Sequence, residues 1–199
     1  MKRQTGPSRS LAVLTVAALL LWASGPARAA TVNWTDADGL WELAGNWDLR
    51  VPLSGDDVVI NVAGVRTITH GAGAGNDAIR TLTNYEIVVI NGGSSLTITT
   101  GGTNTGSIRT GGTTAGTLHL SGGTLTNTGG TLEADENGLI TLMSNATVTG
   151  GTLSTVGSGI ITTPSGGASQ ETATLNGVTI ASGSKFVGAD NSITTLVGI

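Results

Sequence analysis

The sequence predicts an all-β fold, a single-stranded parallel β-helix (solenoid) in which each turn of the chain lies on the turn before it. Short segments rich in Val, Ile and Thr recur between Gly, Asn and Ser, as at 57–62, 86–90 and 95–99. This is the composition of strands joined by tight turns. The triplet Gly-Thr-Leu begins at residues 116, 123, 130 and 151. Its regular spacing predicts a three-sided turn of about 21 residues.

Residues 1–29 have the pattern of a secretory signal peptide. Lys2 and Arg3 begin it, residues 11–22 are apolar, and the small residues at 27–29 offer a cleavage site. The apolar run of about twelve residues is too short to span a bilayer. We therefore expect an exported protein, either secreted, periplasmic or at the cell surface, with no membrane span in the mature chain.

The charge of the predicted mature chain bears on its partners. Cleavage after Ala29 leaves five basic and 13 acidic residues, a net charge of −8. Nucleic acids and anionic lipids attract basic surfaces, so neither is an expected partner. The chain has no cysteine, which excludes disulfides and thiolate metal sites. Its stability must therefore come from backbone pairing and packing.

Residues 30–55 form the first predicted part of the mature chain and contain Trp34, Trp41 and Trp47. The open end of a β-helix exposes unpaired backbone and an apolar core, so it needs a cover. The position of the three tryptophans just before the first strand favours a Trp-rich N-terminal cap. The alternative is that their faces stack on sugar rings.

Residues 56–199 form the second predicted part, the repeats, with six or seven turns and a length of roughly 30 Å at the strand spacing of a sheet. An antiparallel sandwich also has short strands, but it does not require matching positions one turn apart. Three predicted inward columns are Leu132, Leu153, Leu175, Leu196; Leu96, Leu118, Leu139, Ile160, Ile180; and Leu125, Ala146, Ala168.

Threonines alternate with these inward residues and are expected on the solvent face of their strands. With the predicted period, Thr124 and Thr126 align with Asn145 and Thr147. A flat threonine array suggests binding to ice or another crystal surface. In this alignment, however, the array spans three turns and then meets residues 168–170. Ordinary β-propensity on a solvated face is the favoured explanation.

The pattern Trp34, Trp41, Asn46-Trp47, Pro52 and 55–58, followed by Gly-Gly-Thr-Leu repeats, resembles the N-terminal part of large bacterial secreted β-helix proteins. These include autotransporter-type passenger and adhesin-like proteins with autotransporter-associated β-strand repeats. The resemblance covers nearly the whole mature chain and implies architecture and export. Such families serve adhesion, aggregation and scaffolding, and they contribute no catalytic residues to carry over.

This chain departs from that family because it shows no translocating barrel, sorting signal or anchor. Leu196 still lies in the predicted register close to the last residue, Ile199. A complete solenoid usually ends in an atypical capping unit. We therefore expect the chain to be a fragment or the first part of a longer product.

Two segments resemble the first half of a calcium loop. They are Asp36-x-Asp38-Gly39 and Glu133-x-Asp135-x-Asn137-Gly138. The twelfth position, which should be acidic, falls on Gly45 in the first and on Ser144 in the second. Acids and Asn before Gly also form ordinary turns, which is the favoured interpretation. The sequence therefore predicts no cofactor, with calcium as the weaker alternative.

Catalysis is not expected. Lyases and hydrolases on β-helices need clustered acids near Lys or Arg, and between residues 81 and 199 the basic side chains are Arg109 and Lys185. The two histidines, His70 and His119, have no evident partner and are predicted to be exposed surface residues. The leading hypothesis is a structural or adhesive segment of a bacterial surface or secreted protein, whose partners are surface glycans or other surface proteins. The alternative is a carbohydrate-binding module that uses the tryptophans.

Overall fold

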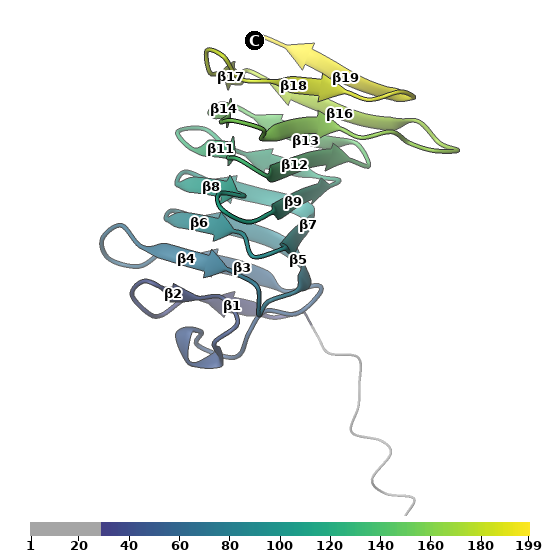
Figure 1. The fold of residues 1–199 in the computed structure, drawn as a ribbon. Coiled ribbons are helices and arrows are strands. Elements are labelled where there is room, and N and C mark those ends of the chain that lie inside the picture. The colour runs from purple at the N-terminus through teal and green to yellow at the C-terminus, as the bar shows by residue number, and fades with distance from the viewer. Residues whose placement is uncertain (1–28) are drawn as a thin grey trace, which may run out of the picture.

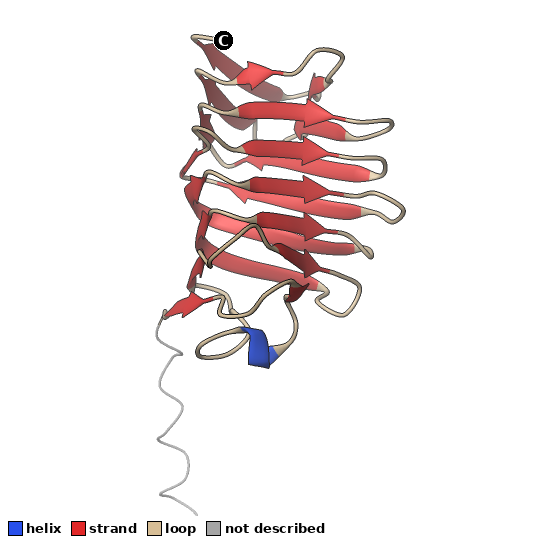
Figure 2. Ribbon diagram, turned by 90° about the vertical axis from the view of Figure 1, so that its left-hand side faces the viewer, coloured by secondary structure: helices blue, strands red, loops and turns tan. Residues whose placement is uncertain are grey.

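The computed structural model describes residues 29–199 and confirms the all-β, parallel solenoid. The predicted signal peptide lies almost wholly outside these described residues. Within them, all paired strands run parallel, and the one helical segment is the short 3-10 turn η1 (Ala44–Asn46). The chain makes about eight turns, stacked from the N-terminal to the C-terminal end in Figure 1. Figure 2 shows the same strands stacked along one side.

A complete turn of the solenoid has three sides, as predicted. Two of them belong to one 12-stranded sheet, because β5 (Asn76–Asn84) and β7 (Ser94–Asn104) run around a corner. The first face holds the N-terminal halves of β5 and β7, then β9 (Gly116–Ser121), β12 (Gly138–Met143), β15 (Ile160–Thr163) and β18 (Phe186–Gly188). The second face holds β1 (Thr31–Asn33), β3 (Asp57–Ile60), the C-terminal halves of β5 and β7, β10 (Thr124–Thr126), β13 (Ala146–Thr149), β16 (Glu171–Asn176) and β19 (Ser192–Val197).

The third face is a separate seven-stranded sheet. Its strands are β2 (Gly39–Leu40), β4 (Thr67–His70), β6 (Ile87–Ile90), β8 (Ser107–Thr110), β11 (Thr131–Ala134), β14 (Thr152–Thr155) and β17 (Thr179–Ile180). The segment 30–55 contributes β1 and β2, which pair with β3 and β4. The Trp-rich segment is thus part of the first turn of the solenoid.

Alternating inward side chains fill a narrow core between the three faces. On the third face Val88, Ile108, Leu132 and Leu153 lie directly above one another and expose at most 2% of their surface. Burial of each aliphatic side chain contributes about 1.5–3 kcal/mol before the entropy cost of ordering the chain. The stacked columns therefore supply most of the favourable free energy of a turn.

β7 turns a corner at Gly101 and Gly102, and the backbone there requires glycine. Gly101 and Gly102 have φ of +102° and +137°, a region that residues with a Cβ atom avoid. A Cβ atom on Gly101 would lie 2.1 Å from the carbonyl oxygen of Thr124, and one on Gly102 would lie 2.0 Å from that of Leu82. Neighbouring turns approach so closely here that only glycine fits.

The predicted inward column that begins at Leu96 is wrong from its third member, Leu139. Leu96 pairs with Leu118 as expected, but Leu118 then pairs with Ile140. Leu139 pairs instead with Thr117, and Ile160 follows it on the outward side with 40% exposure. A slip of one residue moves a side chain to the opposite face of a strand, and in Leu139-Ile140 both residues are apolar, so the pattern did not select the register.

The other two columns also fail. Leu125 pairs with Val148 and not with Ala146, which pairs with Ala173. Leu153 pairs with Ile180 on the third face, whereas Leu175 lies on the second face between Val148 and Leu196. Ala168 is exposed in the segment between β15 and β16 and belongs to no column. The stretch of chain from Leu153 to its partner Ile180 is clearly longer than the stretch that joins two paired residues of β4 and β6. The turns differ in length because their corners do, so no fixed period can hold.

Candidate functional site

The tryptophans of the first turn form one buried cluster. Trp34, Trp41 and Trp47 expose 2%, 0% and 4% of their surface. The Trp47 ring meets Trp34 and Trp41 edge to face, with ring centroids 4.9 and 4.8 Å apart. Its Nε1–H donates to the carbonyl of Trp41 at 2.7 Å. The rings cover the core of the first turn, which favours the capping interpretation. Sugar stacking on these rings stays a prediction, and it would need the cluster to open.

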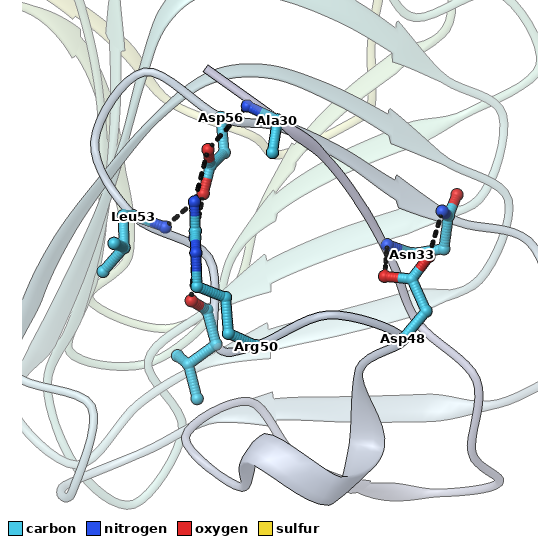
Figure 3. A network of polar contacts seen from close by, with 7 residues as sticks. Ala30, Asn33, Asp48, Arg50, Leu53 and Asp56 are labelled. Carbon is cyan, nitrogen blue, oxygen red and sulfur yellow. Dashed lines mark hydrogen bonds and ion pairs between the residues drawn. The ribbon is translucent and has the colours of Figure 1, made fainter. Parts of the chain in front are cut away.

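Asp56 ties the start of the described chain to the loop before β3 (Figure 3). It is 1% exposed. Its carboxylate accepts the N–H groups of Ala30 at 3.0 Å and Leu53 at 2.8 Å and forms an ion pair with Arg50. Burial raises the pKa of Asp56, but the hydrogen bonds from Arg50, Leu53 and Ala30 outweigh it, and the pKa falls to about 2. Asp56 thus stabilises the first turn as a charged group.

A second bond in Figure 3 anchors β1 itself. The carboxylate of Asp48 accepts the backbone N–H of Asn33 at 2.8 Å and its side-chain Nδ2–H at 2.6 Å. These hydrogen bonds lower the pKa of Asp48. The two carboxylates hold β1 from both of its ends. Neither role has a periodic pattern in the sequence, because the contacts with Asn33 and Ala30 join residues that are 15 and 26 apart.

His70 is buried, and the prediction that it is exposed was wrong. It occupies an inward position of β4, on the same side of the strand as Ile68, and has no exposed surface. Its Nδ1 lies 3.0 Å from Ser94 Oγ and its Nε2 lies 3.2 Å from an oxygen of Asp77. The ring also packs against Trp41 at 5.4 Å. Burial lowers the pKa of His70, against the opposing effect of Asp77.

Ser94, His70 and Asp77 have the residue types of a hydrolytic triad. Ser94 is only 3% exposed, however, and its Oγ lies 2.8 Å from the carbonyl oxygen of His70 and 2.6 Å from that of Asn91. A nucleophile needs an open approach for its substrate. We therefore assign this cluster to the fold, where it joins the Trp cluster to the following turns.

A ladder of buried asparagines follows the strands of the second face. Asn84, Asn104 and Asn127 have no exposed surface. Asn84 Nδ2–H donates to Asn104 Oδ1 at 2.8 Å, and Asn104 Nδ2–H donates to Asn127 Oδ1 at 2.7 Å. The ladder stops at Gly150, whose carbonyl accepts from Asn127 at 3.5 Å. Each amide side chain forms a hydrogen bond with the next turn, so successive turns are held at a fixed spacing at this corner.

The outward side of the second face carries two columns of threonine, which we call the threonine face. The true register pairs Thr124 with Thr147 and Thr126 with Thr149. The predicted period had aligned them with Asn145 and Thr147, so that alignment was wrong. These side chains are exposed or half-buried, whereas Leu125 and Val148 between them are buried, as expected. The columns are Thr81, Thr124, Thr147, Thr174, Thr195 and Thr83, Thr103, Thr126, Thr149.

The residues predicted as calcium ligands have other partners. Asp38 accepts the N–H of Thr67 at 2.9 Å, and Asp36 accepts that of Ala37 at 2.7 Å. On the third face, Arg109 lies 2.7 Å from Glu133 and 3.2 Å from Asp135. Asn137 has φ of 60° and bonds Gly112 and Ser158. Residues 29–199 contain no group of three or more acids or histidines placed to hold a metal ion. Calcium binding stays a prediction.

His119 points outward from β9 between two buried leucines, as predicted, but it is half-buried. Its Nδ1 lies 2.7 Å from Thr141 Oγ1 on the next turn. Burial lowers the pKa of this ring.

Comparison with protein-family models, curated proteins and solved structures gives no match for this chain. The resemblance to autotransporter-type proteins therefore stays a prediction. In the part of the chain that the structure describes, no helix has the length and apolar character needed to cross a bilayer. Function must be argued from the surface of the solenoid itself.

Proposed function

We propose that this chain is a structural, adhesive segment of a bacterial cell-surface or secreted protein, acting through a rigid rod with a repeated surface. The observation that carries the proposal is the threonine face, where outward residues of successive turns stand in register. A repeated face offers many equal contacts, and many weak contacts add up to firm attachment through avidity.

The charged groups support the same proposal. The carboxylates of Asp56 and Asp48 bind backbone N–H groups of β1 or its neighbours, and Arg109 pairs with two acids on its own face. These groups are engaged in holding turns together. The partners we propose are surface glycans or other cell-surface proteins, and the site of action is outside the cytoplasm.

Adhesion by beads coated with the full chain tests the proposal. The test variant carries Thr126→Lys and Thr149→Lys on the threonine face. The control carries Thr131→Lys and Thr152→Lys, which lie on neighbouring turns of the third face and also point outward. We expect the beads to attach to bacterial cells and the test variant to lose attachment while the control keeps it. Equal attachment of both variants, or none by the parent chain, would contradict the proposal.

The alternative function, sugar binding by the Trp cluster, has its own test. In a chain with Trp22→Phe, fluorescence reports on Trp34, Trp41 and Trp47. Their burial predicts weak quenching by iodide, unchanged by oligosaccharides. Strong quenching that a glycan relieves would favour the carbohydrate-binding module over the rod.

A further inference from the structure

The register of the second face extends the threonine array well beyond the three turns expected from sequence. Residues 168–170 were expected to interrupt it, but they lie exposed in the segment between β15 and β16, outside both columns. The array continues to Thr174 and Thr195 at one end and reaches Thr81 and Thr83 at the other. Gly101 leaves one gap, and Asn176 follows Thr149 in the second column. The interruption that argued against a crystal-binding face is therefore absent from the two columns.

The columns form a two-dimensional lattice. Paired parallel strands hold neighbouring threonines about 4.8 Å apart, and alternate residues along one strand lie about 6.6 Å apart. Threonine is β-branched, so its χ1 angle is restricted and few orientations of its hydroxyl and methyl groups are open to it on the strand. The face therefore presents hydroxyl and methyl groups at two fixed repeats, as a surface that matches a crystal lattice requires.

The threonine face is also uncharged. From the second half of β5 to β16, the outward positions of its two columns hold threonine, glycine and asparagine. The nearest charge in register is Asp57, which pairs with Arg80 at the N-terminal edge. The chain as a whole has net charge −4. A neutral face on an acidic chain fits a neutral partner, because a charged partner would find no opposite charge there.

The face has a rigid backing. Leu82, Leu125 and Val148 lie buried beneath it, and the asparagine ladder fixes the corner at the end of the same strands. A surface that is already ordered loses little conformational entropy on binding. A rigid lattice suits a rigid, periodic partner better than a flexible chain.

We infer that the threonine face binds the surface of an ice crystal through its ordered hydroxyl and methyl groups. This goes beyond the proposed function, since ice is a different surface from the bacterial glycans and proteins proposed there. Two rows of matched contacts act together, so a bulky charged side chain within the rows disrupts the fit to the lattice.

The experiment measures thermal hysteresis and partition into a growing ice hemisphere for the full chain and the two lysine variants described above. Circular dichroism and thermal unfolding confirm that each variant is folded. We expect hysteresis and enrichment in ice for the parent chain and for Thr131→Lys/Thr152→Lys. Both should be lost in Thr126→Lys/Thr149→Lys.

Three outcomes overturn the inference. They are exclusion of the parent chain from ice, equal ice binding by both variants, and a parent dimer in sedimentation that Thr126→Lys/Thr149→Lys converts to a monomer while Thr131→Lys/Thr152→Lys does not. Bead adhesion separates this inference from the proposed function. If cell attachment depends on the threonine face but ice binding is absent, the inference fails and the proposed function stands. If ice binding depends on the threonine face but cell attachment does not, the proposed function fails and the ice-binding inference stands.

Discussion

The two ends of the described solenoid use the same parallel pairing, but their apolar side chains are covered very differently. At the N-terminal end, Trp34, Trp41 and Trp47 expose at most 4% of their surface. In the last turn, Leu196, which stacks on the buried Leu175, exposes 59% of its surface, although β19 is fully paired with β16. Backbone pairing alone therefore does not bury the core of a terminal turn. A cover of side chains does, and it sets where the solenoid resists opening.

The largest expected difference between the ends comes from the covering side chains. Trp41→Ala should lower the free energy of unfolding by about 3–5 kcal/mol, because it removes a fully buried aromatic ring. Leu196→Ala, at an exposed position, should change it by about 0.5 kcal/mol or less. Urea unfolding followed by circular dichroism measures both. Similar losses from the two substitutions would show that the Trp cluster is not the main cover.

The Asp56 network should give the next largest effect. Asp56→Ala removes the buried carboxylate and leaves the N–H groups of Ala30 and Leu53 without their acceptor. It should lower the free energy of unfolding by about 2–3 kcal/mol. The pKa of Asp56 is lowered from 3.8 to about 2 by folding, so its stabilisation is complete above pH 3.8 and is lost as the pH falls towards 2. Urea titrations across this range should show a smaller acid loss in Asp56→Ala than in the parent. An identical loss would assign the acid sensitivity to other groups.

The asparagine ladder provides a smaller, matched comparison. Asn104→Ala leaves the amides of Asn84 and Asn127 without their partner and should cost about 1–3 kcal/mol. Asn176→Ala makes the same change at an exposed position of the second face and should cost about 0.5 kcal/mol or less. Thermal unfolding of both variants measures the difference. A cost for Asn176→Ala as large as that for Asn104→Ala would argue against the ladder.

The smallest expected effect is the pH response of His70. Its pKa is lowered in the fold, so the unfolded chain takes up a proton more readily, and stability should decline as the pH falls below 6.5. Asp77 and Glu42 face the ring and oppose this shift. The midpoint of thermal unfolding should therefore fall between neutral and mildly acidic pH in a His119→Gln background. A midpoint that rises over this range would mean that His70 is charged in the folded chain.

The sequence was sufficient for the architecture, because glycine-bounded β-branched segments and recurring triplets determine short stacked strands. It was not sufficient for the register. Leu139 and Ile140 are equally apolar, so alternation could not choose between them, and the exposed segment before β16 lengthened one turn. A search for asparagines one turn apart would have found the ladder, since Asn84, Asn104 and Asn127 recur at nearly that interval.

The candidate site was harder to predict. His70 carries a polar ring at an inward position, which hydrophobic patterning assigns to the surface. Its partners Ser94 and Asp77 come from other strands, and only the pairing of turns brings them together. Asp56 is similar, because its bond to Ala30 joins residues 26 apart, whereas its bond to Leu53 is local. Contacts between loops of unequal length have no periodic signal in the sequence.

The register of the second face is central to the threonine face, and cysteine pairs test it directly because the chain has no native cysteine. The structure pairs Thr126 with Thr149, whereas the period expected from sequence would pair Thr126 with Thr147. Paired positions lie about 4.8 Å apart and the diagonal positions about 8 Å, which is beyond the reach of a disulfide. Mild oxidation should therefore close the bond in Thr126→Cys/Thr149→Cys and leave Thr126→Cys/Thr147→Cys open. Closure in the second variant and not in the first would contradict the register and the face built on it.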